Sequence, residues 1–262
     1  MTEHYIHGFS KAEQERLFAQ ARILAPGVLD GWDLAGVASL LEIGCGVGAE
    51  LDIIRERWPG VKLTGLDRSA DHLAAGHARL PDSISLMQGD ATALPFAGAS
   101  FDRVITIWML EHVSDPVTVM REALRVLKPG GKLVCTEVDN NTFRFDPPSA
   151  VITDWWSRFN RFQQEAGGDP FVGPKLEDLA RRAGAREIRA APARIIDTRR
   201  EPERRRIWLD YLDALLLSGA DNLMSKGYVT EHDKTDLMRE FARLQTNPEV
   251  NFTYFGVRLT CS

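Results

Sequence analysis

Short apolar segments alternate with amphipathic segments between about residue 39 and residue 138. Apolar segments of this length are typical of buried strands, whereas the intervening segments repeat their apolar positions at helical spacing. The predicted strands cover residues 39–43, 61–66, 84–88, 101–107 and 132–138, and the predicted helices cover 49–58, 70–79 and 116–127. Alternation of strands and helices at this rhythm predicts right-handed βαβ units and a parallel sheet.

The pattern is less regular on both sides of this region. Ser10 and Glu13 form a capping-box pattern that starts an amphipathic helix, which Pro26-Gly27 is expected to end. Further helices are predicted at residues 150–166, 176–183, 201–217 and 230–244, and further strands at 186–195 and 251–259. We therefore expect a three-layer α/β/α sandwich with a seven-stranded sheet. Its predicted parts are an N-terminal helical cap (1–34), a core (35–200), a helical insertion (201–247) and the last strand (248–262).

Composition and charge argue against several classes of protein. The formal net charge of the 262 residues is −5, which argues against a nucleic-acid substrate, because phosphate contacts need a basic surface. Cys45, Cys135 and Cys261 have no paired spacing, so neither a disulfide framework nor a metal site is predicted. The chain shows neither a signal-peptide pattern nor a long apolar stretch, and we expect a cytoplasmic protein without a membrane span.

The strongest chemical signal is LEIGCGVG at residues 41–48, between the first strand and its helix. Glycines at this position let the backbone approach a ligand, and the helix N-terminus offers N–H groups. Gly44, Gly46 and Ala49 also satisfy the G-x-G-x-x-A dinucleotide pattern. This segment alone therefore leaves open whether the ligand is a dinucleotide.

Three carboxylates lie at or just after the carboxyl ends of successive strands, and together they favour one kind of ligand. Glu42 lies two residues before the first glycine, where it suits a ligand that carries positive charge rather than a pyrophosphate. Asp67 follows the second strand, where a carboxylate can bind both ribose hydroxyls. Asp90 follows the third strand, within reach of an adenine amino group. The carboxyl ends of parallel strands meet at one edge, so we expect one shared crevice.

These segments resemble the class I S-adenosylmethionine-dependent methyltransferases, in particular the branch similar to quinone C-methyltransferases. The matching segments are EIGCGVG (42–48), GLD (65–67), GDATALPF (89–96), SFD (100–102), LEHV (110–113) and LKPGG (127–131). Residues 5–10 and 173–176 look like a subgroup of the same family. The resemblance covers about residues 35–140 and implies a Rossmann-like sheet whose last strand is antiparallel.

The resemblance also implies roles for individual residues. Gly44 and Gly46 would approach the methionine part of the cofactor, Asp67 would hold the ribose, and Asp90 with the Ala91 backbone would hold the adenine. Cys45 and Arg68 are also expected to bind the cofactor. Glu42 would lie at the charged end of the cofactor, and Trp108 near its sulfonium. Tyr5 is a second aromatic candidate for this contact, because aromatic faces attract cations. The product would be S-adenosylhomocysteine.

Catalytic and acceptor-binding residues are harder to assign. His112, just past the fourth strand, has a side chain whose ordinary pKa suits proton removal near neutral pH, and Asp139 after the fifth strand could orient or deprotonate the acceptor. Phe143, Trp155 and Phe159 belong to an aromatic segment that either covers a planar or apolar acceptor or simply packs on the sheet.

The sequence thus predicts an enzyme that transfers a methyl group to O, N, S or C of a small metabolite. An NAD-dependent oxidoreductase, a non-catalytic S-adenosylmethionine-binding protein and an RNA methyltransferase remain alternatives. We expect a monomer or homodimer, and the sequence does not identify the methyl acceptor.

Overall fold

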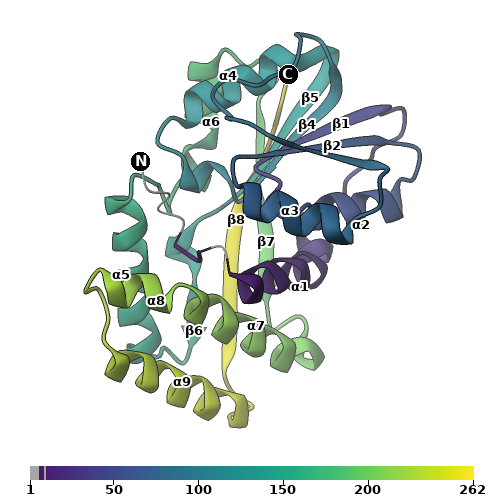
Figure 1. The fold of residues 1–262 in the computed structure, drawn as a ribbon. Coiled ribbons are helices and arrows are strands. Elements are labelled where there is room, and N and C mark those ends of the chain that lie inside the picture. Colours follow the sequence, from purple (N-terminus) through teal and green to yellow (C-terminus); the bar gives the residue numbers. More distant parts are fainter. Residues whose placement is uncertain (1–5, 9) are drawn as a thin grey trace.

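The computed structural model describes residues 6–8 and 10–262, whose strands form one mixed sheet (Figure 1). The strands are β1 (Ser39–Ile43), β2 (Lys62–Asp67), β3 (Ile84–Gln88), β4 (Phe101–Ile107), β5 (Leu127–Val138), β6 (Arg144–Asp146), β7 (Arg189–Asp197) and β8 (Asn251–Cys261). Their order is β3-β2-β1-β4-β5-β8, and β6 and β7 also pair with β8. Strands β1 to β5 are parallel, and β8 is antiparallel to its neighbours. The predicted Rossmann-like fold is confirmed, with β6 as an additional short strand.

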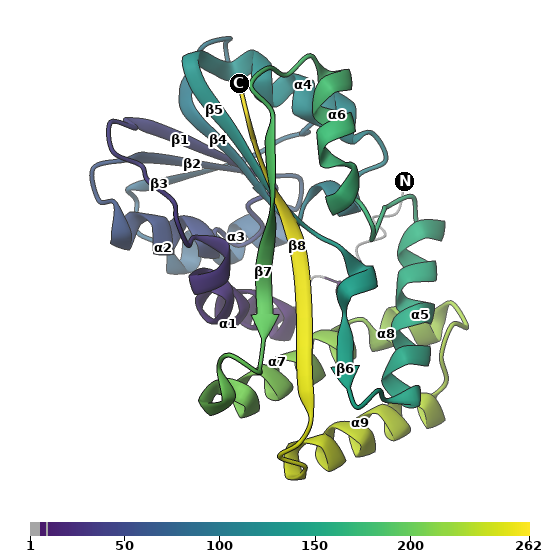
Figure 2. The ribbon, with the colours of Figure 1, turned by 180° about the vertical axis from the view of Figure 1, so that it is seen from behind.

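Helices cover both faces of the sheet (Figure 2). They are α1 (Lys11–Val28), α2 (Ala49–Arg57), α3 (Ala70–Arg79), α4 (Pro116–Val126), α5 (Ala150–Glu165), α6 (Leu176–Ala183), α7 (Arg205–Ser218), α8 (Ala220–Ser225) and α9 (Glu231–Thr246). Successive strand residues point to opposite faces. Leu40 therefore packs in the apolar cluster with α1, α2 and α3, whereas Leu41 packs in the cluster with α4 and α6.

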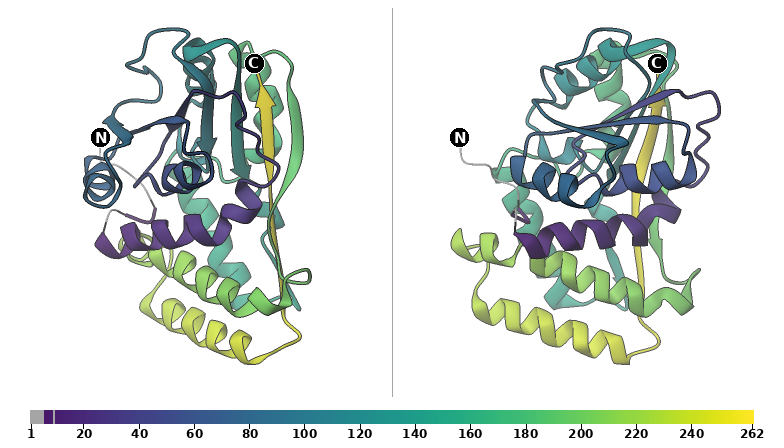
Figure 3. Two further views of the ribbon diagram at one scale, coloured as in Figure 1. Left: turned by 90° about the vertical axis from the view of Figure 1, so that its right-hand side faces the viewer. Right: turned by 45° about the vertical axis from the view of Figure 1, so that its right-hand side comes forward.

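Helices α7, α8 and α9, which lie between β7 and β8 in the sequence, form a further group of helices below the sheet in the view of Figure 1. Helices α7 and α9 pack on each other, α7 packs on α1, and α5 packs on α9. Figure 3 shows α1, α7 and α9 stacked one beneath the other. This insertion places helices opposite the carboxyl ends of the parallel strands. No helix in the described part of the chain has both the length and the apolar character that crossing a bilayer requires.

Helix α1 continues slightly further than predicted. Ser10 caps its N-terminus by accepting a hydrogen bond from the Glu13 N–H, but the helix runs through Pro26 and ends at Val28. Proline removes one intrahelical hydrogen bond, yet its fixed φ is compatible with a helix. The Arg258 guanidinium of β8 donates to the carbonyl oxygens of Gly27 (3.1 Å), Val28 (2.5 Å) and Asp30 (2.7 Å). These bonds satisfy the terminal carbonyls and hold the last turn in place.

Candidate active site

The turn after β1 brings glycine backbone to the edge of the sheet. Gly44, Gly46 and Gly48 have φ angles of 75°, 52° and 73°, in the left-handed region that glycine adopts without strain. The Gly44 N–H donates to the Leu66 carbonyl (2.7 Å), which ties the turn to the end of β2. A Cβ on Gly44 would lie 2.3 Å from Cγ of Met109. A larger residue at this position would therefore displace its surroundings.

Asp67, the last residue of β2, holds the same turn from its side chain. One carboxylate oxygen accepts from the Gly46 N–H (2.8 Å) and the other from the Ser69 N–H (2.8 Å). Ser69 in turn caps α3 by accepting from the His72 N–H (3.2 Å). Each carboxylate oxygen has a further lone pair. Asp67 can therefore bind ligand hydroxyls while it fixes the glycine turn.

Asp90 occupies the corresponding position after β3. Its Oδ1 accepts from the backbone N–H (2.8 Å) and the hydroxyl (2.7 Å) of Thr92. These two hydrogen bonds, helped by the positive charge of Arg68, hold the pKa of the Asp90 carboxyl below its usual value. Asp90 is therefore ionised at neutral pH at the edge of the sheet.

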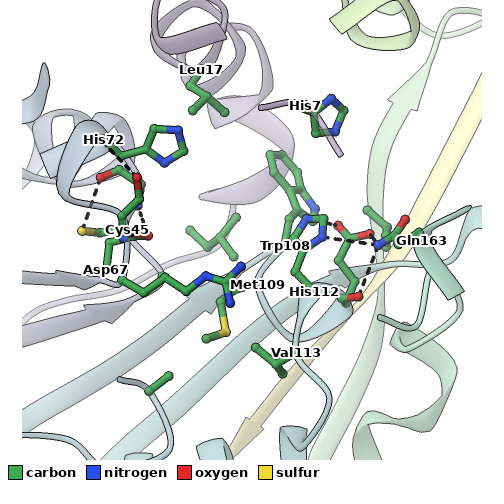
Figure 4. A pocket seen from close by; sticks show the side chains of 18 of the residues that line it. His7, Leu17, Cys45, Asp67, His72, Trp108, Met109, His112, Val113 and Gln163 are labelled. Atoms are coloured by element: carbon green, nitrogen blue, oxygen red, sulfur yellow. Dashed lines mark hydrogen bonds and ion pairs between the residues drawn. The ribbon is translucent and has the colours of Figure 1, made fainter. Parts of the chain in front are cut away.

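One cavity of about 900 Å³ collects most of the predicted site residues. The predicted residues that line it are Gly44, Cys45, Gly46, Asp67, Arg68, Asp90, Ala91, Trp108, His112 and Phe159. The cavity runs from the glycine turn and the tips of β2 and β3 to α1, α5 and α7. Figure 4 shows Cys45 and Asp67 on one side of this space and His7, Trp108 and His112 on the other.

Four predicted residues are absent from that lining, and a fifth cannot be placed. They are Glu42, Asp139, Phe143 and Trp155, while Tyr5 lies outside the described residues. The carboxylate of Asp139 accepts hydrogen bonds from the N–H and side-chain amide of Asn141 (3.1 and 3.0 Å) and so caps a short 3-10 helix. Phe143 stacks on Trp156, with ring centroids 4.1 Å apart, and lines a separate hollow beside β6.

Glu42 is buried beneath the cavity rather than exposed in it. Only 2% of its surface is accessible, and its Oε2 has no hydrogen-bond partner among the described residues. Burial raises the pKa of this carboxyl well above its ordinary value, and the Glu50 and Asp67 carboxylates raise it further. Glu50, in the first turn of α2, lines the cavity instead. Burial also raises the pKa of Glu50, to about 7.

The turn after β4 is held by a buried carboxyl from β5. Glu137 Oε1 accepts from the backbone N–H groups of Met109 (3.1 Å) and Leu110 (2.9 Å), and burial raises the pKa of Glu137 to about 8. Just before this turn, Trp108 has a φ of 49°. Such a conformation costs a non-glycine residue on the order of 1–3 kcal/mol and persists where the surroundings enforce it. Glu137 therefore helps to hold Trp108 at the cavity.

A polar corner of the cavity follows this turn, in the 3-10 helix η1 (Leu110–His112). The Glu111 carboxyl accepts from the Gln163 side-chain amide (2.8 Å) and lies 3.7 Å from His112 Nε2. Burial raises the pKa of Glu111, although His112 and Gln163 counteract this effect. His112 Nδ1 also lies 3.5 Å from the Gln163 amide nitrogen. This corner joins η1 to α5 at the cavity wall.

Helix α5 presents a different face to the cavity than the sequence predicts. We expected Trp155 and Phe159 to lie on the acceptor side, but the cavity-lining positions are Trp156, Phe159 and Gln163. Trp155 is 1% exposed and belongs to the apolar core. Each helical position advances by about 100°. The cavity-facing stripe is therefore centred one residue later than predicted.

Sequence reasoning missed several lining residues that come from distant parts of the chain. Besides Glu50, Trp156 and Gln163, they include His7, Arg16, Leu17, Gln20, Glu111, Tyr211 and Tyr254. One weak signal was available, since Gln20 interrupts the apolar face that Leu17 and Leu24 continue on α1. A polar residue within an apolar stripe is a reason to look for a buried polar partner.

The central part of the chain matches a known family. Residues 41–135 match the family model described as "Methyltransferase domain". This segment is a methyltransferase domain. The predicted resemblance to class I S-adenosylmethionine-dependent methyltransferases is thereby confirmed over the glycine turn and the tips of β2 and β3.

Similar proteins place this domain among diverse methyltransferases. The chain is 40% identical over 115 residues to the demethylmenaquinone methyltransferase of Lactococcus lactis, covering 42% of this chain and 45% of that protein. It is 31% identical over 185 residues to the trans-aconitate 2-methyltransferase of Azoarcus sp., covering 71% of this chain and 62% of that protein. The alignment thus spans less than half of the Lactococcus protein, so it does not by itself transfer that protein's activity.

The fold extends beyond the matched domain. The structure of Haemonchus contortus phosphoethanolamine N-methyltransferase 2 in complex with S-adenosyl-L-methionine superimposes with a TM-score of 0.59 at 16% identity. The superposition covers 99% of this chain and 58% of that chain. The methyltransferase domain and its helical additions therefore share one known architecture.

Proposed function

We propose that this protein is an S-adenosylmethionine-dependent methyltransferase that acts on a small molecule. The observation that carries the proposal is the single cavity lined by the glycine turn, Asp67 and Asp90. Side chains of α1, α5 and α7 line its opposite end, and its volume of about 900 Å³ leaves room for a second molecule beside the cofactor. The methyl group would pass to O, N, S or C of that molecule.

The residues at the sheet edge fit this cofactor. Asp67 offers carboxylate oxygens to ribose hydroxyls, and Asp90 with the Ala91 backbone offers hydrogen bonds to an adenine. The glycine turn leaves backbone exposed to the methionine part, and the acid Glu50 lies on the same side. Bound S-adenosylmethionine supplies an electrophilic methyl group on a sulfonium. Trp108 provides an aromatic surface of the kind that attracts cations.

The protein's main contribution to the reaction is positioning. Holding two reacting atoms about 3–3.5 Å apart in line is worth roughly 7–11 kcal/mol in intramolecular models. Side chains of the helices α1, α5 and α7 line the part of the cavity that would hold the acceptor. His112 lines the same cavity and is proposed to assist where the acceptor must lose a proton. A cytoplasmic location and a monomeric or homodimeric state are part of the same proposal.

Isothermal titration calorimetry tests the cofactor assignment directly. We expect S-adenosylhomocysteine to bind and NAD to give no heat of binding. The activity is tested by incubating the protein with S-adenosylmethionine carrying a tritiated methyl group and with fractions of a metabolite extract, followed by mass spectrometry of labelled products. Binding of NAD in place of S-adenosylhomocysteine would overturn the proposal. Cofactor binding without labelled product in any fraction would indicate that the protein binds S-adenosylmethionine but is not an enzyme.

A further inference from the structure

Glu50 is an acid in the cavity wall whose charge no basic side chain of the described residues neutralises. It lies in the first turn of α2 and lines the cavity. Its carboxyl group receives a hydrogen bond only from its own backbone, and burial raises its pKa to about 7. Burial disfavours the ionised form because it removes water without supplying a counter-charge. A cationic ligand beside Glu50 would supply that counter-charge.

Basic side chains of the same cavity do not fill this role. Those that line it are His7, Arg16, Arg68, His72 and His112. Across residues 6–8 and 10–262, none of them forms an ion pair with Glu50. Arg16, on the neighbouring helix α1, donates two hydrogen bonds to the Glu13 carboxylate (2.7 and 2.6 Å), and burial lowers the pKa of His7 well below its ordinary value. The described side chains thus leave the negative charge of Glu50 for a ligand to compensate.

The other titratable groups near Glu50 are acids or are neutral. The charges of Glu50 and Asp67 raise the pKa of Glu42, which burial has already raised. Burial likewise raises the pKa values of the Cys45 thiol and the Tyr211 hydroxyl, and the charge of Glu50 raises both further. Two more acids and two neutral groups therefore surround Glu50 on β1, β2, the glycine turn and α7.

The order of the strands places Glu50 at one end of the proposed cofactor. Asp90 follows β3, Asp67 ends β2 and the glycine turn follows β1, and these strands are neighbours in the order β3-β2-β1. A cofactor with its adenine at Asp90 and its ribose at Asp67 extends its methionine part toward the glycine turn. Helix α2 begins directly after this turn, at Ala49. Glu50 is therefore the acid of the lining on the methionine side.

Access to the cavity distinguishes Glu50 from the acid that the sequence predicts for this role. Glu42 is 2% exposed and is absent from the lining, whereas Glu50 belongs to it. The methionine part of the cofactor carries two cationic groups, an ammonium and a sulfonium. A carboxylate accepts hydrogen bonds, and only the ammonium group has N–H donors to offer. The contact expected at Glu50 is therefore with the ammonium group.

We propose that Glu50 binds the α-ammonium group of S-adenosylmethionine, and that cofactor binding displaces the proton of this side chain into the solvent. The ammonium group keeps its own protons, so the proton that leaves is that of the Glu50 carboxyl group. This inference rests on the proposed function, since it assigns a residue of the same cofactor site. It places recognition of the amino group on α2, outside the strand that the family resemblance indicates.

Two ligands that differ by one amino group test the contact. They are S-adenosylhomocysteine and S-adenosyl-4-thiobutyrate, which lacks the α-amino group and keeps the carboxylate. Each is titrated calorimetrically into the full-length protein and into Glu50→Gln at about pH 8, where Glu50 is largely ionised. We expect the parent protein to prefer S-adenosylhomocysteine by at least about tenfold, and Glu50→Gln to reduce this preference by at least about fivefold, because a hydrogen bond to an ionised group is lost.

The outcomes separate this inference from the proposed function. The same amino-group preference in Glu50→Gln and in the parent protein would overturn the assignment of Glu50 alone. Failure of S-adenosylhomocysteine to bind the parent protein would instead overturn the proposed function.

Proton release gives a second readout. The heat of S-adenosylhomocysteine binding in buffers with different ionisation enthalpies yields the number of protons released. We expect about one proton at pH 6 and about a tenth of that at pH 8, because an acid with a pKa of about 7 is mostly protonated at the lower pH and mostly ionised at the higher. Glu50→Gln should abolish most of the release at pH 6. Unchanged release in this variant would assign the proton to another group and contradict the proposal.

A matched variant and a shorter ligand serve as controls. Glu56→Gln makes the same chemical change in α2, at an exposed position that pairs with Arg22 (3.2 Å) outside the cavity lining, and should change neither readout. 5′-Methylthioadenosine lacks both charged groups of the amino-acid part and should bind Glu50→Gln as tightly as the parent protein. Weaker binding of this compound would place the effect at the adenosine end and would also contradict the assignment.

Discussion

The two ends of the cavity are built in different ways. At the glycine turn, the site consists of the tips of the consecutive strands β1, β2 and β3 and the loops that follow them. At the end away from the glycine turn, which we call the acceptor end, the walls include side chains from α1, α5, α7 and β8, which are distant in sequence and meet only through packing. The first arrangement is constrained by the parallel sheet, whereas the second can change with each helix.

This difference indicates at which residues a substitution could change the methyl acceptor with the least effect on the rest of the structure. Asp67 bonds to the glycine turn and to the start of α3, so changing it alters several elements at once. Leu17 or Leu215, on single helices, could be changed without affecting that network. Variants at the two ends should therefore have separable effects. Those of Asp67→Ala are expected to be the largest and those of Tyr211→Phe the smallest.

Asp67→Ala should have the largest effect, a loss of two to three orders of magnitude in S-adenosylhomocysteine affinity. The variant loses hydrogen bonds to an ionised group, each worth roughly 1.5–3 kcal/mol, both toward the ligand and toward the Gly46 N–H. Calorimetry measures the affinity, and far-ultraviolet circular dichroism checks the fold. Asp71→Ala, on the exposed side of α3, is the control. Unchanged affinity in Asp67→Ala would show that Asp67 does not bind the ribose.

Gly44→Ala should destabilise the fold by about 2–3 kcal/mol, because it combines an unfavourable φ with a clash against Met109. Gly31→Ala is a matched control, since Gly31 has a similar φ of 71° but no atom within 4 Å of its added Cβ. Urea unfolding of both variants measures the difference. Equal destabilisation of the two would show that the contact with Met109 is readily relieved.

Glu42, Glu50 and Glu111 also have raised pKa values, so the stability of the protein should fall as the pH rises above about 4.5. Glu137 alone should contribute roughly 1 kcal/mol per pH unit to this fall, up to about pH 8. Its folded pKa of about 8 lies above the ordinary value of 4.5, so over this range the folded state retains a proton that the unfolded state has lost. Glu137→Gln should flatten this part of the pH profile. The measurement is urea unfolding at several pH values, with the exposed Glu249→Gln as control. An identical slope in Glu137→Gln and the parent protein would contradict the assignment.

Tyr211→Phe should have the smallest effect, a loss of about 0.5–1 kcal/mol in stability. Its hydroxyl donates to Gln20 Oε1, and that oxygen keeps its hydrogen bond from Arg16 in the variant. Because Tyr211 belongs to the acceptor end, the dissociation constant of S-adenosylhomocysteine should stay within twofold. A tenfold change in that constant would show that the two ends are coupled.

The sequence was most informative where a residue's position along a strand determines its location in the folded protein. Asp67 and Asp90 could be assigned to one crevice because parallel strands end at a common edge. Glu42 lies on such a strand too, but period-two alternation does not say which buried acid faces a ligand, and Glu50 occupies the lining instead.

The acceptor end could not be predicted in the same way. The choice between Trp155 and Trp156 depends on the rotation of α5, which packing against α9 helps to set. The short strand β6 and helix α8 carry no clear pattern of their own. Pro26 is followed by two further helical residues because Arg258, far along the chain, binds the carbonyl oxygens of that last turn.

The bonds from Arg258 also determine when the cavity is completed during synthesis. Helix α1 is synthesised before the strands of the sheet, but the guanidinium that anchors its end lies 230 residues after Val28 in the sequence. Until that strand has emerged and paired, one wall of the cavity lacks its fixed support. A nascent chain can assemble its strand tips early, yet it encloses an acceptor only after the last strand has joined the sheet.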